Sequence, residues 1–141
     1  MQFRVHQKSK KKLKEKIKAL LTSRKVQNIK TLYIRLKRMC QGWINYFILA
    51  NMKQFLMELD QWIRRRIRMI YWRRWKRIRT KIRNLTKLGC PPQKAYEYGN
   101  TRKGAWRTAK SPILHKTITN KRLAKAGLLS LHSYYISRLG Y

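Results

Sequence analysis

The sequence predicts an all-α chain, with a three-helix bundle over residues 1–88 and a smaller helical, loop-rich basic module over residues 89–141. Three observations support this fold. Apolar residues recur at spacings of three and four in three successive segments, which is the period of amphipathic helices. Gly89 followed by Pro91 and Pro92 is a typical helix end. Hydrophobic residues make up 43% of the 141 residues, which is enough for a buried core.

The first predicted helix covers residues 10–22, with Ser9 as its N-cap. Its apolar face is formed by Leu13, Ile17, Leu20 and Leu21. The other faces carry lysines, among them Lys11, Lys14 and Lys18. A charge run of this kind usually only solvates a helix, and contact with a polyanion is the alternative.

A polar turn over Thr22–Gln27 leads to a second helix, which Asn28 caps and which runs to about Ala50. Its apolar positions are Leu32, Leu36, Met39, Cys40, Trp43, Phe47 and Ala50. Three aromatic residues are predicted to belong to the core: Trp43, Tyr46 and Phe47. Gly42 lies in mid-helix, where glycine costs roughly 1 kcal/mol relative to alanine. We therefore expect a neighbouring backbone to pack closely against it.

The third predicted helix begins near Lys53 and runs past Lys81. Its first half has an apolar stripe made of Leu56, Leu59, Ile63, Ile67 and Ile70. Its second half has another stripe, made of Tyr71, Trp75, Ile78, Ile82 and Leu85. At about 100° per residue, the second stripe is rotated from the first by about 70°. We therefore predict a bend or a change of packing partner over Ile70–Arg74.

Trp72 lies off both stripes, on a face that carries the cations Arg65, Arg68, Lys76, Arg79 and Arg83. In that position the indole could stack on a nucleobase or a sugar. It could equally pack inside the protein beneath the C-terminal segment, as buried aromatic residues commonly do. The sequence leaves both roles open.

Three helices are predicted in the C-terminal module. A short one covers Pro92 to Tyr98. Thr119 caps the next, which runs to Ala126 and ends at Gly127. The last covers Leu128 to Leu139, and its inward-facing residues are Leu128, Leu131, Tyr135 and Leu139.

The charge balance points to a polyanionic partner. The chain has 37 Lys and Arg residues against 4 Asp and Glu, a net charge of +33. Self-repulsion at such a charge opposes folding and favours a bound anion. Because aromatic residues are interleaved with the cations between Arg64 and Lys87, nucleic acid is the polyanion that fits best.

The same scarcity of acids argues against an enzyme. Two-metal nucleotidyl transfer needs clustered carboxylates, and the four acids are dispersed: Glu15, Glu58, Asp60 and Glu97. The three histidines show no ligand spacing, and Cys40 and Cys90 form no CxxC pair, so neither a metal, a cofactor nor a disulfide framework is predicted. No secretory signal is recognised, and a cytoplasmic protein without membrane contact is expected.

Several motifs in a fixed order resemble the maturase-specific domain of bacterial group II intron-encoded proteins. They cover nearly the whole chain and are Gly42–Phe47, Leu59–Arg68, Trp72–Lys76, Leu88–Gly89, Asn100–Arg107, Ser111–Pro112, Thr119–Asn120 and Ala126–Leu131. The departures are small: Lys37 stands where the family often has Asn, and Gln41 where a basic residue is common. The number and order of the motifs make the resemblance specific.

The resemblance implies a three-helix thumb, called domain X, that grips group II intron RNA and helps it reach its splicing-competent form. It also implies a following region that contacts target DNA during intron mobility. In the family both regions follow the fingers and palm of a reverse transcriptase. The 141 residues contain no Tyr-x-Asp-Asp motif, so the expectation is a fragment of such a polymerase or a truncated reading frame, without polymerase activity.

The predicted nucleic-acid contacts are the cations of the three basic segments together with Trp72. They are Arg64, Arg65, Arg68, Trp72, Arg73, Lys76, Arg77, Arg79 and Arg83, then Lys11, Lys14 and Lys18, and then Arg102, Lys103 and Arg107. The expected function is intron RNA binding that assists splicing. The alternatives are a thumb subunit that completes a separately encoded fingers and palm chain, a generic basic RNA-binding protein, a membrane-surface helix, and a decayed product without a selected function.

Overall fold

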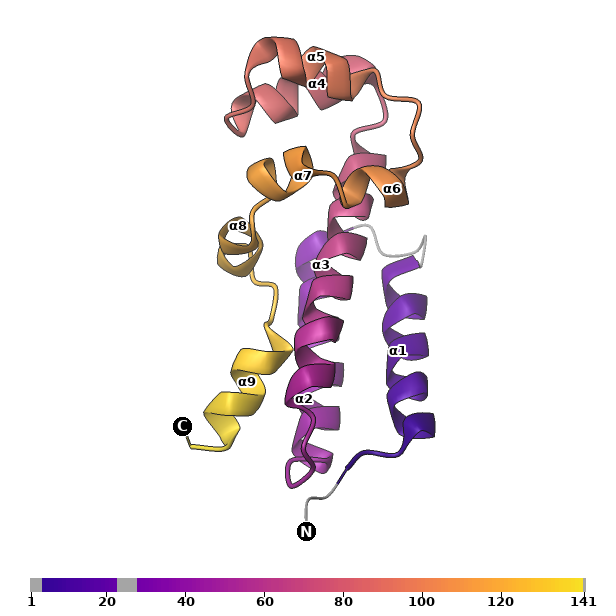
Figure 1. Ribbon diagram of the computed structural model, residues 1–141, viewed down its shortest axis with the longest axis vertical. Coiled ribbons are helices and arrows are strands. Elements are labelled where there is room, and N and C mark those ends of the chain that lie inside the picture. The colour runs from indigo at the N-terminus through magenta and orange to yellow at the C-terminus, as the bar shows by residue number, and fades with distance from the viewer. Residues whose placement is uncertain (1–3, 23–27, 141) are drawn as a thin grey trace. The chain divides into compact units, whose positions relative to one another are not determined.

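The computed structural model describes residues 4–22 and 28–140, and in these ranges every regular element is an α-helix (Figure 1). The all-α fold that the sequence predicts is confirmed. The helices are α1 (Gln7–Thr22), α2 (Ile29–Tyr46), α3 (Lys53–Arg74), α4 (Ile78–Lys87), α5 (Pro92–Gly99), α6 (Ala105–Ala109), α7 (Pro112–Thr117), α8 (Asn120–Lys125) and α9 (Leu131–Arg138).

The chain forms two compact units. The first consists of Met1–Trp62 together with Ala124–Tyr141, and the second of Ile63–Leu123. Helix α3 contributes its first turns to one unit and its remaining turns to the other. These compact units do not divide at Leu88, where the sequence suggests a boundary, so the functional modules 1–88 and 89–141 stay a prediction.

The first unit is built on helix α2, which contacts both α1 and α9 (Figure 1). Its core includes side chains that are at most 3% exposed, among them Leu13, Ile17, Leu36, Cys40, Ile44, Leu56, Leu59 and Leu131. Burial raises the pKa of the Cys40 thiol to about 12, and the Asp60 carboxylate adds to this rise. Cys40 is therefore a protonated core residue, as its place on the apolar stripe predicts.

Two helix starts in the first unit test the capping predictions. Asn28 caps α2 as predicted, because its Oδ1 accepts a hydrogen bond from the Lys30 N–H at 2.8 Å. The predicted Ser9 cap is wrong: α1 begins at Gln7, and His6 Nδ1 accepts from the Lys8 N–H at 3.1 Å. A histidine can accept a bond at the N-cap position, but serine is the commoner signal. Most of the predicted turn at Thr22–Gln27 lies outside the described residues.

Helix α2 ends at Tyr46, four residues before the predicted end. Trp43 and Phe47 are half-buried, with ring centroids 4.8 Å apart. Tyr46 is 82% exposed, so its predicted place in the core is wrong. Leu139 is 38% exposed at the end of α9, and its predicted inward position is wrong as well. Both residues lie at a helix end, because Tyr46 is the last residue of α2 and Leu139 is the C-cap of α9.

The prediction that a neighbouring backbone packs closely against Gly42 is also wrong. A Cβ atom at this position would have no neighbouring heavy atom within 4 Å, so no backbone packs against it. We expect Gly42→Ala to raise the free energy of unfolding by about 1 kcal/mol, because alanine is the better residue in a helix interior. Urea denaturation followed by circular dichroism measures the change.

A matched control is Gly127→Ala. Gly127 ends the segment after α8 with φ at +111°, a conformation that side chains rarely adopt. This variant should lower the free energy of unfolding. Equal effects of the two substitutions would show that alanine acts on the unfolded chain and not through the helix.

The third predicted helix is interrupted. Helix α3 ends at Arg74 and α4 begins at Ile78, close to the predicted bend at Ile70–Arg74. A straight helix could not bury two apolar stripes that differ by about 70° in direction. The interruption also removes adjacent cations from one continuous helix, where like charges three or four residues apart repel.

In the second unit, α4 and α5 lie side by side (Figure 1). Gly99 makes this approach possible, because a Cβ atom there would lie 2.6 Å from Ile82 Cγ1. Helix α4 ends at Lys87 with Leu88 as its C-cap, and Gly89 follows with φ at +100°, so the predicted helix end at Leu88–Gly89 is confirmed. Thr119 Oγ1 accepts from the Arg122 N–H at 3.1 Å and so caps α8, also as predicted.

Among the described residues, no helix has both the length and the apolar character needed to cross a bilayer.

Candidate nucleic-acid interface

Positive charge is concentrated in the second unit. Residues 63–123 contain twenty Lys and Arg residues and a single acid, Glu97. Few neighbouring carboxylates are available to neutralise these cations within the unit. Each cation that reaches the surface would therefore increase the affinity of the unit for an anionic partner.

The end of α3, the link to α4 and α4 itself carry five of the predicted contacts in exposed positions. These residues, called the α3–α4 cations below, are Arg73, Lys76, Arg77, Arg79 and Arg83. The helix break leaves Lys76 and Arg77 in the link, where their side chains are exposed. Clustered arginines suit a polyanion because each planar guanidinium can bridge phosphate oxygens and stack on bases.

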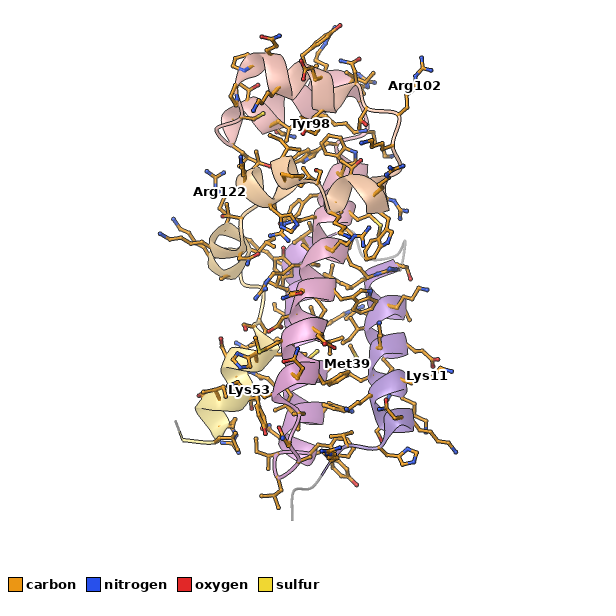
Figure 2. The ribbon with its side chains drawn as sticks, in the orientation of Figure 1. Lys11, Met39, Lys53, Tyr98, Arg102 and Arg122 are labelled. Atoms are coloured by element: carbon orange, nitrogen blue, oxygen red, sulfur yellow. The ribbon has the colours of Figure 1, made fainter. Side chains whose placement is uncertain are left out.

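The remaining predicted cations on the surface come from both units. Arg102, Lys103 and Arg107 are exposed on the segment around the start of α6, and Lys11, Lys14 and Lys18 are exposed on α1. Figure 2 shows the side chains of Arg102 and Lys11 directed outward. Lys14 Nζ also lies 5.0 Å from the Trp62 ring centroid, so part of the lysine face covers an aromatic side chain.

Trp72 occupies the interior. Its side chain is 2% exposed, and its ring centroid lies 6.1 Å from that of Trp75. Lys81 Nζ lies 4.8 Å from the Trp72 ring centroid. Of the two roles that the sequence left open, the structure thus shows packing, and it leaves no free indole face for a base. Two neighbouring aromatic residues, Tyr71 and Trp75, are half-buried, and both belong to the second predicted apolar stripe.

Arg68 is also interior, which corrects its predicted place among the surface contacts. It is 2% exposed, and it donates from Nε to the Ile118 carbonyl at 2.8 Å and from Nη2 to Asn120 Oδ1 at 2.7 Å. Burial, with repulsion from Arg64 as a second cause, lowers the pKa of Arg68 to about 10. Its donors are directed to Ile118, which follows α7, and to Asn120, the first residue of α8; residues 112–125 are called the α7–α8 segment below.

Arg65 has a structural partner as well. The half-buried guanidinium donates from Nε and Nη2 to the Trp106 carbonyl at 3.1 and 2.9 Å. Its central carbon lies 3.7 Å from the Trp106 ring centroid. Arg64 is half-buried nearby in sequence, and Arg66, which was not predicted as a contact, is 9% exposed with a pKa lowered by burial and then by Arg73.

These interior positions had a signal in the sequence. Arg65, Arg68 and Trp72 follow each other at spacings of three and four, so they share one face of the helix. Once Trp72 packs inside, the two arginines on the same face are carried toward the interior with it. The first arginines of the basic run thus position α6 and the α7–α8 segment, while the later ones remain on the surface.

Two cavities lie in the second unit. The first, about 300 Å³, is lined by Tyr71, Trp75, Asn84, Lys87, Leu88, Thr117, Ile118, Arg122 and Leu123. The second, about 330 Å³, is lined by Tyr98, Thr101, Lys103, Arg107, Thr108, Lys110, Ser111 and Pro112. Figure 2 shows Arg122 pointing outward and Tyr98 lying among other side chains. The first cavity could not be predicted from the sequence, because it combines segments that are distant along the chain, whereas the second is lined by the single stretch of residues 98–112.

Comparison with known proteins supports the resemblance for the motifs between Gly42 and Gly89. The model of the group II intron maturase-specific domain matches residues 10–89, which is more than half of the chain. No curated protein matches. The matched region is the maturase-specific part and does not include a catalytic reverse transcriptase motif. The chain therefore belongs to the group II intron maturase-specific domain family, which gives it a maturase-related role.

Proposed function

We propose that this chain binds group II intron RNA and, through that binding, assists splicing of the intron. The observation that carries the proposal is the accumulation of twenty cations against one acid in residues 63–123, with the α3–α4 cations at the surface. A site that neutralises several phosphates releases condensed counterions, and this term supplies affinity without requiring a base sequence. Membership of the maturase-specific family supports intron RNA as the polyanion.

The electrostatic mechanism predicts a strong dependence on salt. If about six phosphates are neutralised, the slope of log K against log salt concentration should be near −5 on duplex RNA and smaller on single strands. Replacing Arg73, Arg79 and Arg83 with glutamine should reduce the slope by about 1 for each lost contact and weaken binding of all sequences. Fluorescence anisotropy with labelled intron RNA, between about 50 and 200 mM salt, measures both quantities.

The matched control is the triple substitution of Arg35, Lys37 and Arg38 by glutamine, which removes three exposed charges from α2 in the first unit. Equal losses in the two triple variants would show that affinity follows net charge alone, and a slope near zero would refute the electrostatic mechanism. A splicing assay on precursor RNA tests the second half of the proposal: the spliced fraction should rise with the wild-type chain and not with the Arg73, Arg79 and Arg83 variant.

Target DNA is part of the same proposal. Arg102, Lys103 and Arg107 are exposed, and Lys103 and Arg107 line the second cavity together with Lys110. Cations arranged around a cavity with hydroxyl groups suit a phosphate oxygen of either RNA or DNA. Substitution of Arg102, Lys103 and Arg107 by glutamine should weaken DNA binding more than intron RNA binding. Equal losses for both nucleic acids would remove the separate DNA role.

A second candidate function is docking onto a separately encoded fingers and palm chain. Tyr46 and Leu49, each 82% exposed around the end of α2, favour it, because large exposed apolar side chains often mark a protein contact. Co-purification with a polymerase chain that lacks its thumb tests it. The interaction should be lost in the Tyr46→Ser, Leu49→Ser double variant, and retained binding in that variant would exclude this surface.

A further inference from the structure

We propose that the first cavity of the second unit is a pocket for one unpaired nucleobase of the bound nucleic acid. This inference rests on the proposed function, and it adds a contact that reads a base to contacts that hold phosphates. The distinction matters because phosphate contacts position a protein on nucleic acid without carrying sequence information. Single-stranded loops and bulges are recognised through bases that leave the stack and enter such sites.

Three segments build the pocket. Tyr71 and Trp75 come from the end of α3 and the residue that follows it. Asn84, Lys87 and Leu88 come from α4 and its C-cap, and the last wall is formed by Thr117, Ile118, Arg122 and Leu123 of the α7–α8 segment. Its volume of about 300 Å³ lies at the small end of the range for ligand pockets, about 300 to 1,000 Å³, which suits a ligand of nucleoside size.

The walls are rigid where an aromatic ligand would touch them. Trp72 is buried beside Trp75, at 6.1 Å between ring centroids, so it supports that ring from the interior. Arg68 binds the Ile118 carbonyl at 2.8 Å and thereby holds the opposite wall. Ile118 and Leu123 are 6% and 2% exposed, so their positions are set by packing. A pocket with fixed walls binds a flat ring without a large ordering penalty.

The chemistry of the lining fits a base better than another aromatic or apolar group. Tyr71 and Trp75 provide aromatic surface, on which any base can stack. The Asn84 amide provides both a donor and an acceptor, which is the combination presented by base edges. Lys87 and Arg122 line the pocket and are exposed, so they are available to the phosphates on either side of the inserted nucleotide.

The charge of the surroundings favours the same occupant. The second unit has twenty cations and one acid, so a nucleic acid is drawn to this surface before any base enters the pocket. An apolar side chain of a protein partner would offer no hydrogen-bonding or charged group to Asn84, Lys87 and Arg122. The structure therefore assigns the pocket to a base that is attached to a charged backbone.

The test uses the unaltered chain and three hairpin RNAs of the same stem: one fully paired, one with a single bulged 2-aminopurine, and one with an abasic bulge. The two bulged RNAs have the same number of phosphates, so their electrostatic contribution to binding is matched. We expect the 2-aminopurine RNA to bind about tenfold more tightly than the abasic RNA, because one stacked base has roughly this effect. The 2-aminopurine fluorescence should also change on binding.

Three variants locate the effect. Trp75→Ala and Asn84→Ala should remove the difference between the bulged RNAs, while the slope of affinity against salt stays unchanged. Tyr96→Ala is the matched control: Tyr96 is 64% exposed in the same unit and does not line the cavity, so the difference should persist. Circular dichroism of each variant shows whether its helices are intact. The comparison of the three RNAs uses the unaltered chain, so it does not depend on whether the variants fold.

The outcomes separate the pocket from the proposed function. Equal affinities for the two bulged RNAs, with normal dependence on salt, would overturn the base pocket and leave RNA binding in place. That result is also expected if the cavity receives a side chain of a protein partner. Failure of all three RNAs to bind would overturn the proposed function and the pocket together. A difference that persists in both Trp75→Ala and Asn84→Ala would place the base elsewhere and overturn the assignment.

Discussion

Asp60→Ala should lower the free energy of unfolding by about 3 kcal/mol or more, because it leaves several buried hydrogen-bond donors without an acceptor. Asp60 is 4% exposed and accepts three hydrogen bonds, from Ser130 Oγ at 3.0 Å, from the Leu131 N–H at 2.8 Å and from the His132 N–H at 3.1 Å. The carboxylate thus satisfies the first amide groups of α9 and lies at the positive end of that helix. Removing it leaves buried donors without an acceptor.

Asp60→Asn separates the charge from the shape. The amide keeps one acceptor oxygen but presents an NH₂ group where the other oxygen accepts from Ser130 and His132. We therefore expect a smaller loss than in Asp60→Ala, measured by urea denaturation followed by circular dichroism. Hydrogen exchange of the Leu131 and His132 amides should accelerate in both variants. Unchanged exchange at these amides would show that another group anchors α9.

Arg68→Met should lower the free energy of unfolding by about 2 to 3 kcal/mol, because it removes two hydrogen bonds from a charged donor. Methionine fills much of the space of the arginine stem but gives no donor to the Ile118 carbonyl, which lies in a residue only 6% exposed. The loss is partly offset because a buried charge is no longer desolvated. Thermal and urea denaturation measure the change in stability.

A crossed comparison distinguishes interior arginines from surface arginines. Arg79→Met removes an exposed arginine of α4 and should change stability by less than about 0.5 kcal/mol, while it weakens RNA binding. Arg68→Met should do the reverse when RNA binding is measured at a temperature where the variant remains folded. A variant of Arg68 that is fully stable but binds RNA poorly would contradict the interior role.

Arg68→Lys extends the same comparison. Lysine keeps the positive charge but replaces the planar fork with a single ammonium group, which cannot reach two acceptors in the arginine geometry. We expect it to recover only part of the stability lost in Arg68→Met. Full recovery would mean that charge, and not the directed pair of bonds to Ile118 and Asn120, holds the α7–α8 segment.

Local chemistry made much of the fold predictable. The caps at Asn28 and Thr119 and the left-handed glycines at positions 89 and 127 depend on residues within a few positions of each other, and all four were predicted. The helical period identified the core of the first unit for the same reason. The break between α3 and α4 was visible as a rotation of the apolar stripe, and it follows directly after the predicted segment Ile70–Arg74.

Contacts between distant segments were not predictable. The acceptors of Arg68 lie about 50 residues further along the chain, so the helix face that it shares with Trp72 could indicate burial but could not identify the groups that it would bind. The return of α9 to α2, with the Tyr135 hydroxyl donating to the Ala50 carbonyl at 2.8 Å, is of the same kind. The cations on α4 could be predicted as exposed, whereas the pocket beside them requires three segments at once.

The division of the chain also decides how it can be shortened. Residues 63–123 are inserted into a unit whose two parts lie before and after them in sequence, so a cut after Leu88 removes α9 from the core that it completes. Such a truncated chain would expose the face that covers Leu131 and Tyr135 and leave the Asp60 carboxylate without its three donors. Deleting residues 63–123 and joining Trp62 to Ala124 through a short linker keeps both parts of the first unit. This fragment should be more stable than the chain that is cut after Leu88.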